Sequence, residues 1–277
     1  MPELPEVETV RRTLARLVVG KQIADVTVGL PRMIKAPDDV RQFVEELRGQ
    51  RIHRMGRRGK FLLFYMDNVV LVSHLRMEGR YGLYRADEEV EKHTHVIFHF
   101  TDGTELRYRD VRTFGTMHLF PLGLEEAGPP LHKLGLEPFD PAFTPDELKQ
   151  RMAHRRTKIK PLLLNQEIVV GLGNIYVDEV LFAAGVHPEK LPAELTDEQW
   201  KLLHQHIIII LEQSIELGGS SIKSYVNGQG ESGNFQHILK AYGRTGEPCI
   251  ICGAPIEKSV VGGRGTHTCP NCQSRNS

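Results

Sequence analysis

Apolar residues near the start of the chain recur at helical spacing. They lie three or four residues apart, at Val7, Val10, Leu14 and Leu17. Because an α-helix completes a turn in about 3.6 residues, this spacing places them on one face. Glu3, Glu6 and Glu8 crowd the first turns, where acidic side chains suit the helix dipole. The pattern predicts a helix from Pro2 to about Val18.

Short apolar runs separated by turn residues follow, up to about residue 120. The segment 61–74 is interrupted by Asp67-Asn68, and the segment 95–109 by Asp102-Gly103. Asp-Gly between two such runs is typical of a tight hairpin turn. A further run covers 115–120. These runs predict a strand-rich lobe, built as a sandwich or a barrel, with at least one helix.

The segment 121–141 holds five prolines and three glycines, a composition typical of a connection between lobes. Beyond it the pattern is helical. Thr144 and Thr196 each begin a capping box, and the second of these helices is expected to end at Gly218-Gly219. Another helix is expected to begin near Ile175, after a glycine-rich turn.

The fold class predicted is α+β with two lobes. The N-terminal lobe is a β-sandwich flanked by helices, and the C-terminal lobe is helical. The expected boundaries are 1–130 for the first lobe, 131–142 for the linker, 143–240 for the helical lobe with its Gly/Ser/Asn-rich loop 218–236, and 241–277 for the last segment.

No stretch of about 18 consecutive apolar residues occurs, so no membrane-spanning helix is expected. The chain begins Met-Pro-Glu-Leu-Pro-Glu, without the basic start and apolar run of a signal peptide. We therefore expect a cytoplasmic protein that has no membrane partner.

Charge is balanced over the whole chain but is locally segregated. Lys plus Arg and Asp plus Glu each number 35. Residues 51–60 contain five basic side chains and 149–166 contain six, with no acid in either segment. Two basic runs on a neutral body indicate a surface that faces a polyanion. The alternative is that both runs are ordinary solvated faces.

All four cysteines lie near the end of the chain, as Cys249-x-x-Cys252 and Cys269-x-x-Cys272. Two such pairs can supply four thiolate ligands to one tetrahedral Zn²⁺, which leaves no open position for water. Disulfides are the alternative, but they are rare in a reducing compartment. Short strands are expected at 256–261 and 266–268, around a glycine-rich tip that carries Arg264. One structural Zn²⁺ is predicted, because so short a hairpin cannot build an apolar core.

Four motifs together give the chain a family resemblance. They are Met1 to Thr9 (MPELPEVET), Arg58-Gly59-Lys60, Gly173-Asn174-Ile175-Tyr176, and Gly263-Arg264-Gly265 within the four-cysteine terminus. In this order the chain resembles bacterial formamidopyrimidine-DNA glycosylases over its whole length. The resemblance implies a β-sandwich lobe, a helix-two-turn-helix lobe and a zinc finger. It also implies a base-excision repair enzyme that removes oxidised purines, typically 8-oxoguanine opposite cytosine, and cleaves the strand by β,δ-elimination.

The first residues of the chain include groups that could react with a sugar. If Met1 is removed, Pro2 becomes a secondary amine that is partly unprotonated near neutral pH and can attack a sugar carbon to form an iminium. Read locally, Pro2 only begins a helix and Glu3 is a first-turn acid. The resemblance implies that Pro2 is the nucleophile, Glu3 the acid/base that helps open the deoxyribose ring, and Glu6 a supporting residue.

The resemblance also places Lys60 and Arg264 in the catalytic group, as residues that contact phosphates near the reacting nucleotide, together with Asn174. Lys60 would otherwise be a strand-edge lysine, Arg264 a solvated turn residue and Asn174 a helix N-cap. Lys60 is also the alternative candidate for the nucleophile. Gripped phosphates would kink the duplex at a flipped nucleotide.

A flipped nucleotide leaves a gap in the duplex, and the resemblance assigns three residues to fill it. Arg112 would face the orphaned cytosine, Phe114 would wedge into the stack and Met77 would occupy the gap. An exposed Met or Phe is otherwise most often part of a core. By the same resemblance Gln166 and Tyr242 contact DNA, and Ser220 to Tyr225 form a loop that closes over the oxidised base.

Two other functions stay open. A sister glycosylase for oxidised pyrimidines would share Pro2, Glu3 and the zinc hairpin, but Leu4, the Arg112-x-Phe114 pair and the long loop after Gly219 favour the purine enzyme. A non-catalytic DNA-binding zinc protein would have no use for the Met1-Pro2-Glu3 start. We expect double-stranded DNA as the partner and a monomer as the working form.

Overall fold

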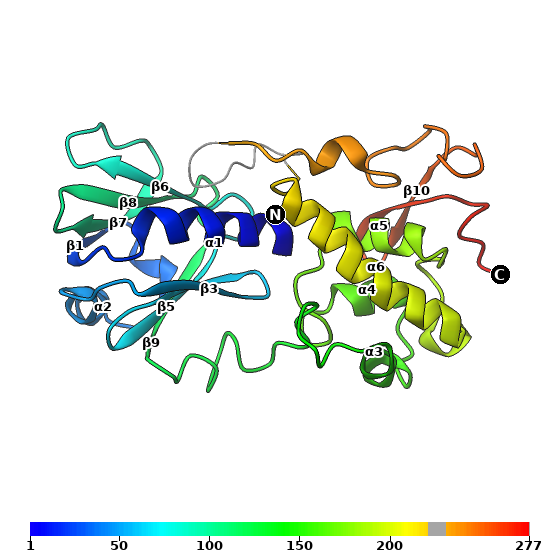
Figure 1. The fold of residues 1–277 in the computed structure, drawn as a ribbon, viewed down its shortest axis with the longest axis horizontal. Helices are drawn as coiled ribbons and strands as arrows, with labels where there is room; N and C mark the ends of the chain where they lie inside the picture. Colours follow the sequence, from blue (N-terminus) through cyan, green and yellow to red (C-terminus); the bar gives the residue numbers. More distant parts are fainter. Residues whose placement is uncertain (221–230, 277) are drawn as a thin grey trace. The chain divides into compact units, whose positions relative to one another are not determined.

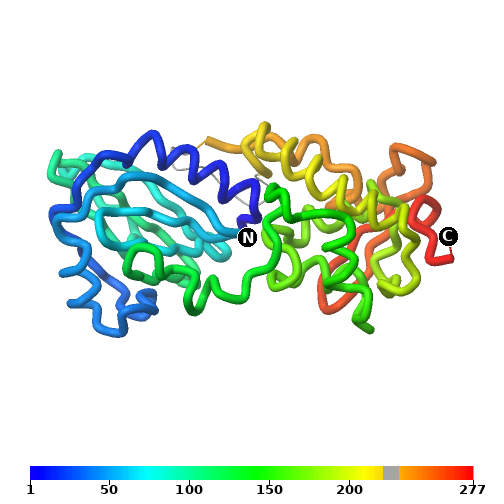
Figure 2. Tube along the Cα trace, turned by 60° about the horizontal axis from the view of Figure 1, so that its bottom comes forward, coloured from blue at the N-terminus to red at the C-terminus, as the bar shows by residue number. Residues whose placement is uncertain are grey.

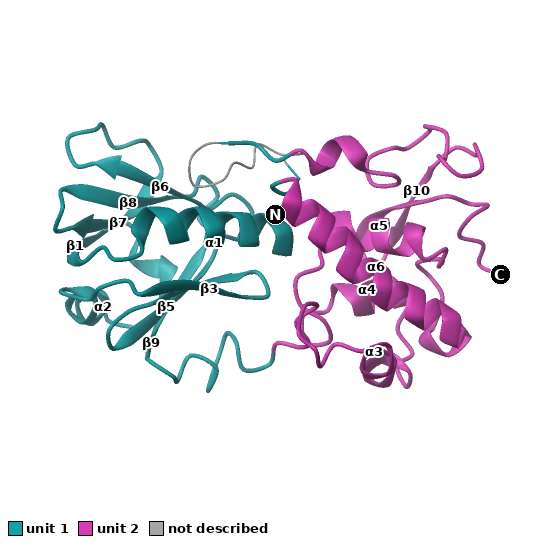
Figure 3. Ribbon diagram, in the orientation of Figure 1, with its two compact units in different colours: residues 1–133, 218–233 teal, residues 134–217, 234–277 magenta. Residues whose placement is uncertain are grey.

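The computed structural model describes residues 1–220 and 231–276. The chain divides into two compact units, shown in Figure 3. The N-terminal unit comprises Met1–Lys133 and Gly218–Gly233, and the C-terminal unit comprises Leu134–Leu217 and Asn234–Ser277. The segment 218–233 thus leaves the helical part of the chain and belongs to the N-terminal unit. None of the helices in the described ranges is long and apolar enough to cross a membrane.

The described residues of the N-terminal unit form two β-sheets and two α-helices (Figure 1). A five-stranded sheet has the order β2-β9-β5-β4-β3, and a four-stranded sheet has the order β1-β7-β8-β6. The bounds are α1 Leu4–Val18, β1 Ile23–Val28, β2 Ile34–Ala36, α2 Val40–Leu47, β3 Arg54–Arg58, β4 Phe61–Tyr65, β5 Val69–His74, β6 Arg80–Arg85, β7 Thr94–Phe100, β8 Thr104–Arg109 and β9 Thr116–Pro121.

One apolar core joins the two sheets, as a sandwich requires. Leu62 and Phe64 of β4 belong to the same buried cluster as Phe98 of β7 and Leu106 of β8. The apolar face of α1 enters this cluster too, through Val7, Val10, Leu14 and Val18. Both hairpins predicted from the sequence are present, with β4 and β5 paired and β7 and β8 paired.

An ion-pair cluster ties α1 to strand β3. The carboxylate of Glu8 accepts hydrogen bonds from Arg11 at 2.7 Å and from Arg57 of β3 at 3.2 Å. Burial of Glu8 would raise its pKa, but the hydrogen bond and charge of Arg11, with Arg12 and Arg57, lower the pKa below its usual value. Glu8 therefore stays ionised and holds the helix on the sheet.

The C-terminal unit packs helices around α5 and ends in a hairpin. Its bounds are α3 Pro145–Met152, α4 Ile159–Leu164, α5 Asn174–Ala183, α6 Asp197–Glu216, β10 Glu257–Val261 and β11 Arg264–Thr268. Helix α5 contacts α4, α6 and β11. In the Cα trace of Figure 2 the last part of the chain, orange to red, returns to lie beside these helices.

Several elements lay outside the sequence expectation. Strands β1, β2, β3 and β6 and helix α4 carry no turn signal or periodicity strong enough to mark them. Helix α2 does carry one that was missed, because Val40, Phe43, Val44 and Leu47 share one helical face after the N-cap Asp39. The helix starts were better specified, because Thr144 and Thr196 accept hydrogen bonds from Glu147 N at 3.1 Å and Gln199 N at 3.1 Å. These N-caps begin α3 and α6, as predicted.

Candidate functional site

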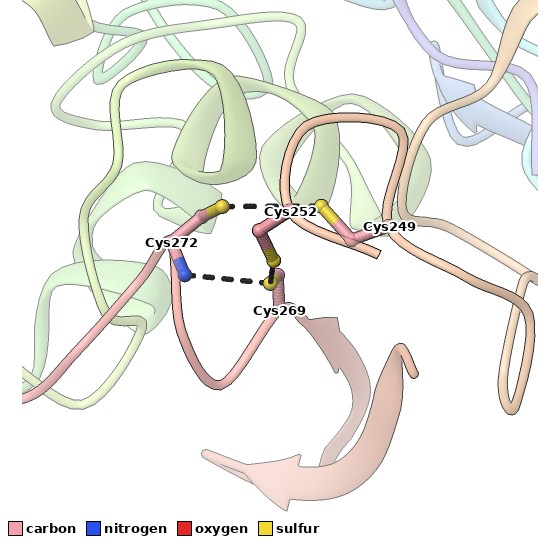
Figure 4. Close-up of side chains that lie close together, drawn as sticks. All are labelled: Cys249, Cys252, Cys269 and Cys272. Carbon is pink, nitrogen blue, oxygen red and sulfur yellow. Dashed lines mark hydrogen bonds between the residues drawn. The ribbon is translucent and has the colours of Figure 1, made fainter. Parts of the chain in front are cut away.

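The four cysteines converge at the end of the C-terminal unit (Figure 4). Their sulfur atoms all lie within 4.8 Å of one another and form no disulfide. The Sγ atoms of Cys249 and Cys272 are 3.9 Å apart, and those of Cys252 and Cys269 are 3.4 Å apart. A tetrahedral Zn²⁺ with sulfur ligands at about 2.3 Å requires sulfur separations of about 3.8 Å.

Backbone amides support the same cysteines. Ile251 N donates to Cys249 Sγ at 3.4 Å, and Cys272 N donates to Cys269 Sγ at 3.3 Å. Each bond lies within one Cys-x-x-Cys knuckle and favours a negatively charged sulfur. The donor set therefore fits one structural Zn²⁺, which holds the two knuckles together and leaves no ligand position for substrate.

The hairpin between the knuckles turns at Gly262-Gly263, and both glycines have positive φ, +58° and +74°. Arg264 is the first residue of β11 and pairs with Val261, so this strand begins two residues earlier than the sequence predicted and Arg264 lies outside the turn. Two glycines suffice for the turn because positive φ at both central residues gives a type I′ geometry. Arg264 is exposed immediately beside it.

A buried ion pair lies directly behind Arg264. Lys160 Nζ of α4 donates to Asp178 Oδ1 of α5 at 2.7 Å, to Gly265 O at 3.0 Å and to Thr266 Oγ1 at 2.8 Å. The other oxygen of Asp178 accepts from His267 N at 3.0 Å. Strand β11 is thus attached to two helices by a desolvated charge pair.

Asn174 joins the same cluster from the start of α5. Its Nδ2 donates to Gly265 O at 2.9 Å, while its buried Oδ1 has no hydrogen-bond partner among the described residues. Gly173 is the N-cap and Asn174 is the first helical residue, so the local reading of Asn174 as the N-cap was wrong. The structure therefore brings Asn174 and the residue after Arg264 into direct contact.

The backbone of Tyr242 is held by Glu179 of α5. Glu179 accepts hydrogen bonds from Lys240 N, Ala241 N and Tyr242 N, each at 2.8 Å. Burial raises the pKa of Glu179, although the three amides act in the opposite direction. The Tyr242 ring lies 4.9 Å from the ring of His267, edge to face. Tyr242 is therefore fixed against the zinc hairpin.

Gln166 is occupied within its own unit. Its Nε2 donates to Leu164 O and Leu172 O, both at 3.0 Å, and its Oε1 accepts from Gly171 N at 2.9 Å. The side chain thus shapes the glycine-rich turn ahead of α5.

Pro2, Glu3 and Glu6 are buried at the start of α1. Glu6 Oε2 accepts from Glu3 N at 2.9 Å, and Glu6 Oε1 accepts from Ser220 N at 2.7 Å. A Cβ on Gly219 would lie only 3.0 Å from Glu6, and Gly219 has φ +80°. One carboxylate therefore connects the residue after Pro2 with the start of the segment 218–233. The predicted loop residues 221–225 lie outside the described residues.

Lys60 is buried where β3 turns into β4, after Gly59, whose φ is +56°. His74 of β5 lies close by, with its ring 4.5 Å from Phe61 and edge on to it. Burial, with the charges of Arg76 and Lys60, lowers the pKa of His74 to about 3. The ring is therefore neutral at pH 7, and its Nδ1 accepts a hydrogen bond from Arg76 N at 2.9 Å.

The three proposed gap-filling residues lie on two exposed loops of the N-terminal unit. Met77 is 36% exposed and Phe114 52% exposed. The Arg112 guanidinium lies 5.0 Å from the centre of the Phe114 ring. Arg76 and Thr113, each next to one of these residues, have positive φ, +54° and +59°. Strained loops with exposed apolar tips are unusual unless they serve a binding surface.

One lysine of the second basic run is withdrawn from the surface, and three of its other charges lie in partly exposed ion pairs. Lys160 is buried against Asp178, and the ion pairs Lys149–Asp197, Arg151–Glu147 and Lys158–Glu189 engage three more of its charges. Arg155 and Arg156 are exposed. Counting charges over 149–166 did not reveal these pairs, because the acids come mainly from other segments. That the rest of the run faces a polyanion stays a prediction.

Sequence reasoning also missed Asp110 and Asp178. Asp178 lies in an apolar helix, and nothing in the sequence of that helix indicates that it pairs with a buried lysine. Asp110 directly follows a predicted strand and precedes a turn, where an aspartate commonly accepts amides from the residues just after it. That signal could have identified Asp110.

Three family models match the chain. The formamidopyrimidine-DNA glycosylase N-terminal domain matches residues 1–117, the H2TH domain of the same family matches residues 134–226, and the zinc finger found in FPG and IleRS matches residues 246–275. The chain is 63% identical over 273 residues to the formamidopyrimidine-DNA glycosylase of Brevibacillus brevis, covering 99% of both chains. It is also 63% identical to that of Halalkalibacterium halodurans, covering 99% of this chain and all of that one.

Solved structures of similar proteins agree. A Lactococcus lactis FPG variant in complex with a Fapy-dG-containing DNA has a TM-score of 0.93 and 45% identity, covering 99% of this chain and 100% of that one. The complex between Lactococcus lactis Fpg and an abasic-site-containing DNA has a TM-score of 0.92 and the same identity and coverage.

Proposed function

The chain belongs to the formamidopyrimidine-DNA glycosylase family, and from that premise we propose that its chemistry proceeds through a covalent intermediate on Pro2. It is a base-excision repair enzyme, a glycosylase for oxidised purines that is also a lyase for abasic sites. The residue assignments below are our proposal for how this chain performs that reaction.

The observation that carries the proposal is the environment of the first helix. Pro2 and Glu3 are buried ahead of α1, and the Glu6 carboxylate holds Glu3 N at 2.9 Å. A buried carboxylate beside an N-terminal secondary amine suits proton transfer, because low solvent exposure strengthens the interaction of both groups with a bound sugar. Glu6 also accepts from Ser220 N. It therefore links the start of α1 to the first residue of the loop that the resemblance places over the oxidised base.

After Met1 is removed, the Pro2 nitrogen attacks C1′ of the damaged nucleotide. The N–C1′ bond forms as the bond to the base breaks, and the base leaves with the electron pair. The nitrogen then loses its proton, which neutralises the departing base, and so recovers its lone pair. Glu3 protonates the ring oxygen, so the deoxyribose opens and the nitrogen lone pair completes an iminium. Loss of a proton from C2′ then expels the 3′ phosphate, and a second elimination expels the 5′ phosphate.

We propose that the remaining site residues hold DNA. Lys60, Asn174 and Arg264 contact phosphates that flank the lesion. Tyr242 and Gln166, which belong to the same C-terminal unit as Asn174 and Arg264, are further DNA contacts. Met77, Arg112 and Phe114 fill the gap left by the flipped base. Zn²⁺ supplies only stability, and Cys249, Cys252, Cys269 and Cys272 hold it.

We further propose that the protein acts as a monomer on double-stranded DNA in the bacterial cytoplasm, since its relatives are bacterial glycosylases. The proposed domain boundaries are 1–130, 131–142, 143–240 and 241–277.

The test is to trap the intermediate. Borohydride reduces an iminium to a stable amine, so peptide mass mapping of the reduced protein–DNA adduct identifies the nucleophile. We expect the adduct on the peptide that begins at Pro2. Protein that retains Met1 should form no adduct, because an acylated proline nitrogen has no available lone pair. An adduct on Lys60, or full activity with Met1 retained, would contradict the assignment.

A second variant separates binding from chemistry. Glu3→Gln keeps the shape but loses proton transfer, so it should bind lesion DNA normally and process it at least about 100-fold more slowly. Glu45→Gln on the exposed face of α2 is the matched control. Duplexes with an oxidised pyrimidine belong in the same assay, because one similar structure is a Lactococcus lactis Fpg complex with DNA that contains an oxidised pyrimidine.

A further inference from the structure

The two loops that carry the proposed gap-filling residues share one support. The first loop runs from Leu75 to Gly79 and carries Met77; the second runs from Asp110 to Gly115 and carries Arg112 and Phe114. The loops are more than 30 residues apart in the chain. Each contains a non-glycine residue with positive φ, a conformation that persists only where surrounding contacts enforce it.

The shared support is the hydroxyl of Tyr108, the residue before the last of β8. A Cβ built on Gly79 would lie 2.3 Å from this hydroxyl oxygen, and one built on Gly115 would lie 1.7 Å from it. No side chain can occupy either place, so both loop backbones rest directly on Tyr108. The ring itself is 1% exposed and lies 5.0 Å from the ring of Tyr81, which fixes it in the core.

Asp110 connects Tyr108 to the second loop. Its Oδ2 accepts from Gly115 N at 2.8 Å and from the Tyr108 hydroxyl at 3.3 Å, and its Oδ1 accepts from Arg112 N at 3.1 Å. Asp110 is 1% exposed. A buried carboxylate thus uses both oxygens to hold the backbone on each side of Thr113 and Phe114.

The rest of Asp110 is anchored in the sheet. Its N donates to His93 O at 3.0 Å, and its O accepts from His95 Nε2 at 2.9 Å. The first loop has its own bonds, from Gly79 N to Leu75 O at 3.0 Å and from Arg76 N to His74 Nδ1 at 2.9 Å. The two loops are therefore separately closed, and Tyr108 is the contact that they have in common.

We propose that Tyr108 and Asp110 are positioning residues that hold Met77 at a fixed separation from Arg112 and Phe114, and so determine discrimination of the base opposite the lesion. This inference rests on the proposed roles of those three residues. A displacement of about 1 Å in a recognising group is enough to lose its hydrogen bonds. The reaction at Pro2 does not involve these loops once the nucleotide is flipped.

Two substitutions test the support. Asp110→Asn replaces one of the two acceptor oxygens by an NH₂ group, which cannot accept a hydrogen bond. The backbone N–H of either Gly115 or Arg112 then loses its acceptor. Tyr108→Phe removes only the hydroxyl and leaves the ring in place. Tyr84→Phe is the matched control, because Tyr84 belongs to the neighbouring strand β6 and its hydroxyl donates to Glu91 at 3.1 Å, away from both loops.

The assay compares three substrates under single-turnover conditions: 8-oxoguanine opposite cytosine, 8-oxoguanine opposite adenine, and a preformed abasic site. Asp110→Asn should slow excision opposite cytosine at least about tenfold, the equivalent of one lost buried hydrogen bond, and should reduce the cytosine-to-adenine preference. Cleavage of the abasic site should stay within about twofold, and Tyr108→Phe should show the same pattern more weakly.

A steric cycle supplies independent evidence. Gly115→Ala should be as defective as Asp110→Asn because its Cβ meets the hydroxyl at 1.7 Å. Tyr108→Phe relieves only part of this clash, because the nearest remaining ring atom would still lie at 2.8 Å and Asp110 Oδ2 at 3.1 Å. The double variant should therefore be less defective than the sum of the two single variants, because both act at one contact. Fully additive losses would show that the two positions are uncoupled and would contradict the proposal.

A merely structural role predicts a different result. If Asp110→Asn and Tyr108→Phe slow all three substrates in proportion, or change none of them, the positioning role is wrong while the proposed function stands. If the unaltered protein excises no oxidised purine, the proposed function fails and this inference fails with it. Thermal melting of each variant shows whether a uniform loss comes from unfolding.

Discussion

The turn that carries Phe114 in the N-terminal unit lies over a large apolar core, whereas the turn beside Arg264 in the zinc hairpin lies over very little. The first turn rests on Tyr108, which belongs to the cluster that joins both sheets. The apolar cluster beside the zinc knuckles consists of Phe182, Ala241, Cys249, Ile256 and Cys269. Two of these five are zinc ligands, so a metal and buried polar contacts replace most of the core.

The two turns show that a turn can be held in one conformation either by a large apolar core or by metal and buried polar contacts. In the sandwich, the hydrophobic effect holds the scaffold, and one carboxylate, Asp110, shapes the turn. In the hairpin, four thiolates and the Lys160–Asp178 pair hold the scaffold itself. The hairpin should therefore respond to chelation and to loss of charge, and the sandwich should not.

Metal loss should have the largest effect. Cys269→Ser, or removal of zinc by a chelator, should unfold the hairpin and weaken DNA binding by about 100-fold or more, because the ligand bonds supply its folding energy. The melting transition of the N-terminal unit should not move. Zinc content, DNA binding and calorimetry measure the three quantities, with Ser259→Ala on exposed β10 as control. Full affinity in metal-free protein would contradict the comparison.

Breaking the buried ion pair should come next. Asp178→Asn leaves Lys160 buried without its counter-charge and should destabilise the C-terminal unit by about 3–5 kcal/mol. Trp200, the single tryptophan, is buried in α6 of this unit, so its fluorescence during urea unfolding reports the change.

Two further variants sharpen that measurement. Lys160→Met with Asp178→Leu removes both charges and should regain much of the lost stability. Glu147→Gln, which breaks the partly exposed pair with Arg151, should leave the midpoint nearly unchanged. Equal losses from the buried and the partly exposed pair would refute the role of burial.

Substitutions at the two turns should affect binding differently. Arg264→Ala should weaken binding to every duplex by about tenfold and reduce the salt dependence by about one phosphate contact. Phe114→Ala should impair excision from duplex far more than cleavage of an abasic site. Binding titrations over a salt series measure the first effect, with Lys201→Ala on α6 as control. A change of lesion preference alone in Arg264→Ala would exclude a phosphate role.

The last effect expected is a pH dependence that is stronger in the sandwich than in the C-terminal unit, where burial also lowers the pKa of His187 and His206. The pKa of His74 is lowered to about 3 by burial and by Arg76 and Lys60, and that of His118 to about 4 by burial and by Lys35 and Arg76. Between these values and an unfolded pKa near 6.5 the unfolded chain binds more protons, so stability is complete above about pH 6.5 and falls as the pH is lowered.

The measurement is the melting temperature of the N-terminal unit from pH 7 to pH 4, which should fall by several degrees or more. His74→Asn keeps an acceptor near the position of Nδ1 but does not titrate, so its curve should be flatter. A variant curve parallel to that of the unaltered protein would show that His74 does not contribute.

Much of this protein follows from local patterns in its sequence. The helical spacing of Val7 to Leu17, the turn at Asp102-Gly103 and the caps at Thr144 and Thr196 predict elements that the structure contains. The cysteine spacing predicts the zinc site for the same reason: each knuckle lies within four residues, and backbone geometry alone brings its two sulfurs together.

Other features depend on segments that meet only in the folded chain. No residue near Lys160 in the sequence indicates that it contacts Asp178 and Gly265 in the folded chain. Its basic neighbours instead suggested a contact with phosphate. Gly79 and Gly115 are ordinary loop glycines in the sequence, and only the Tyr108 hydroxyl between them shows why a side chain is excluded. The sequence by itself determined many of the elements, the metal ligands and the family of the chain, because periodicity, caps and ligand spacing are short-range. The tertiary structure decided which charges are buried and which turns share a support, because burial and pairing depend on residues far apart in the chain.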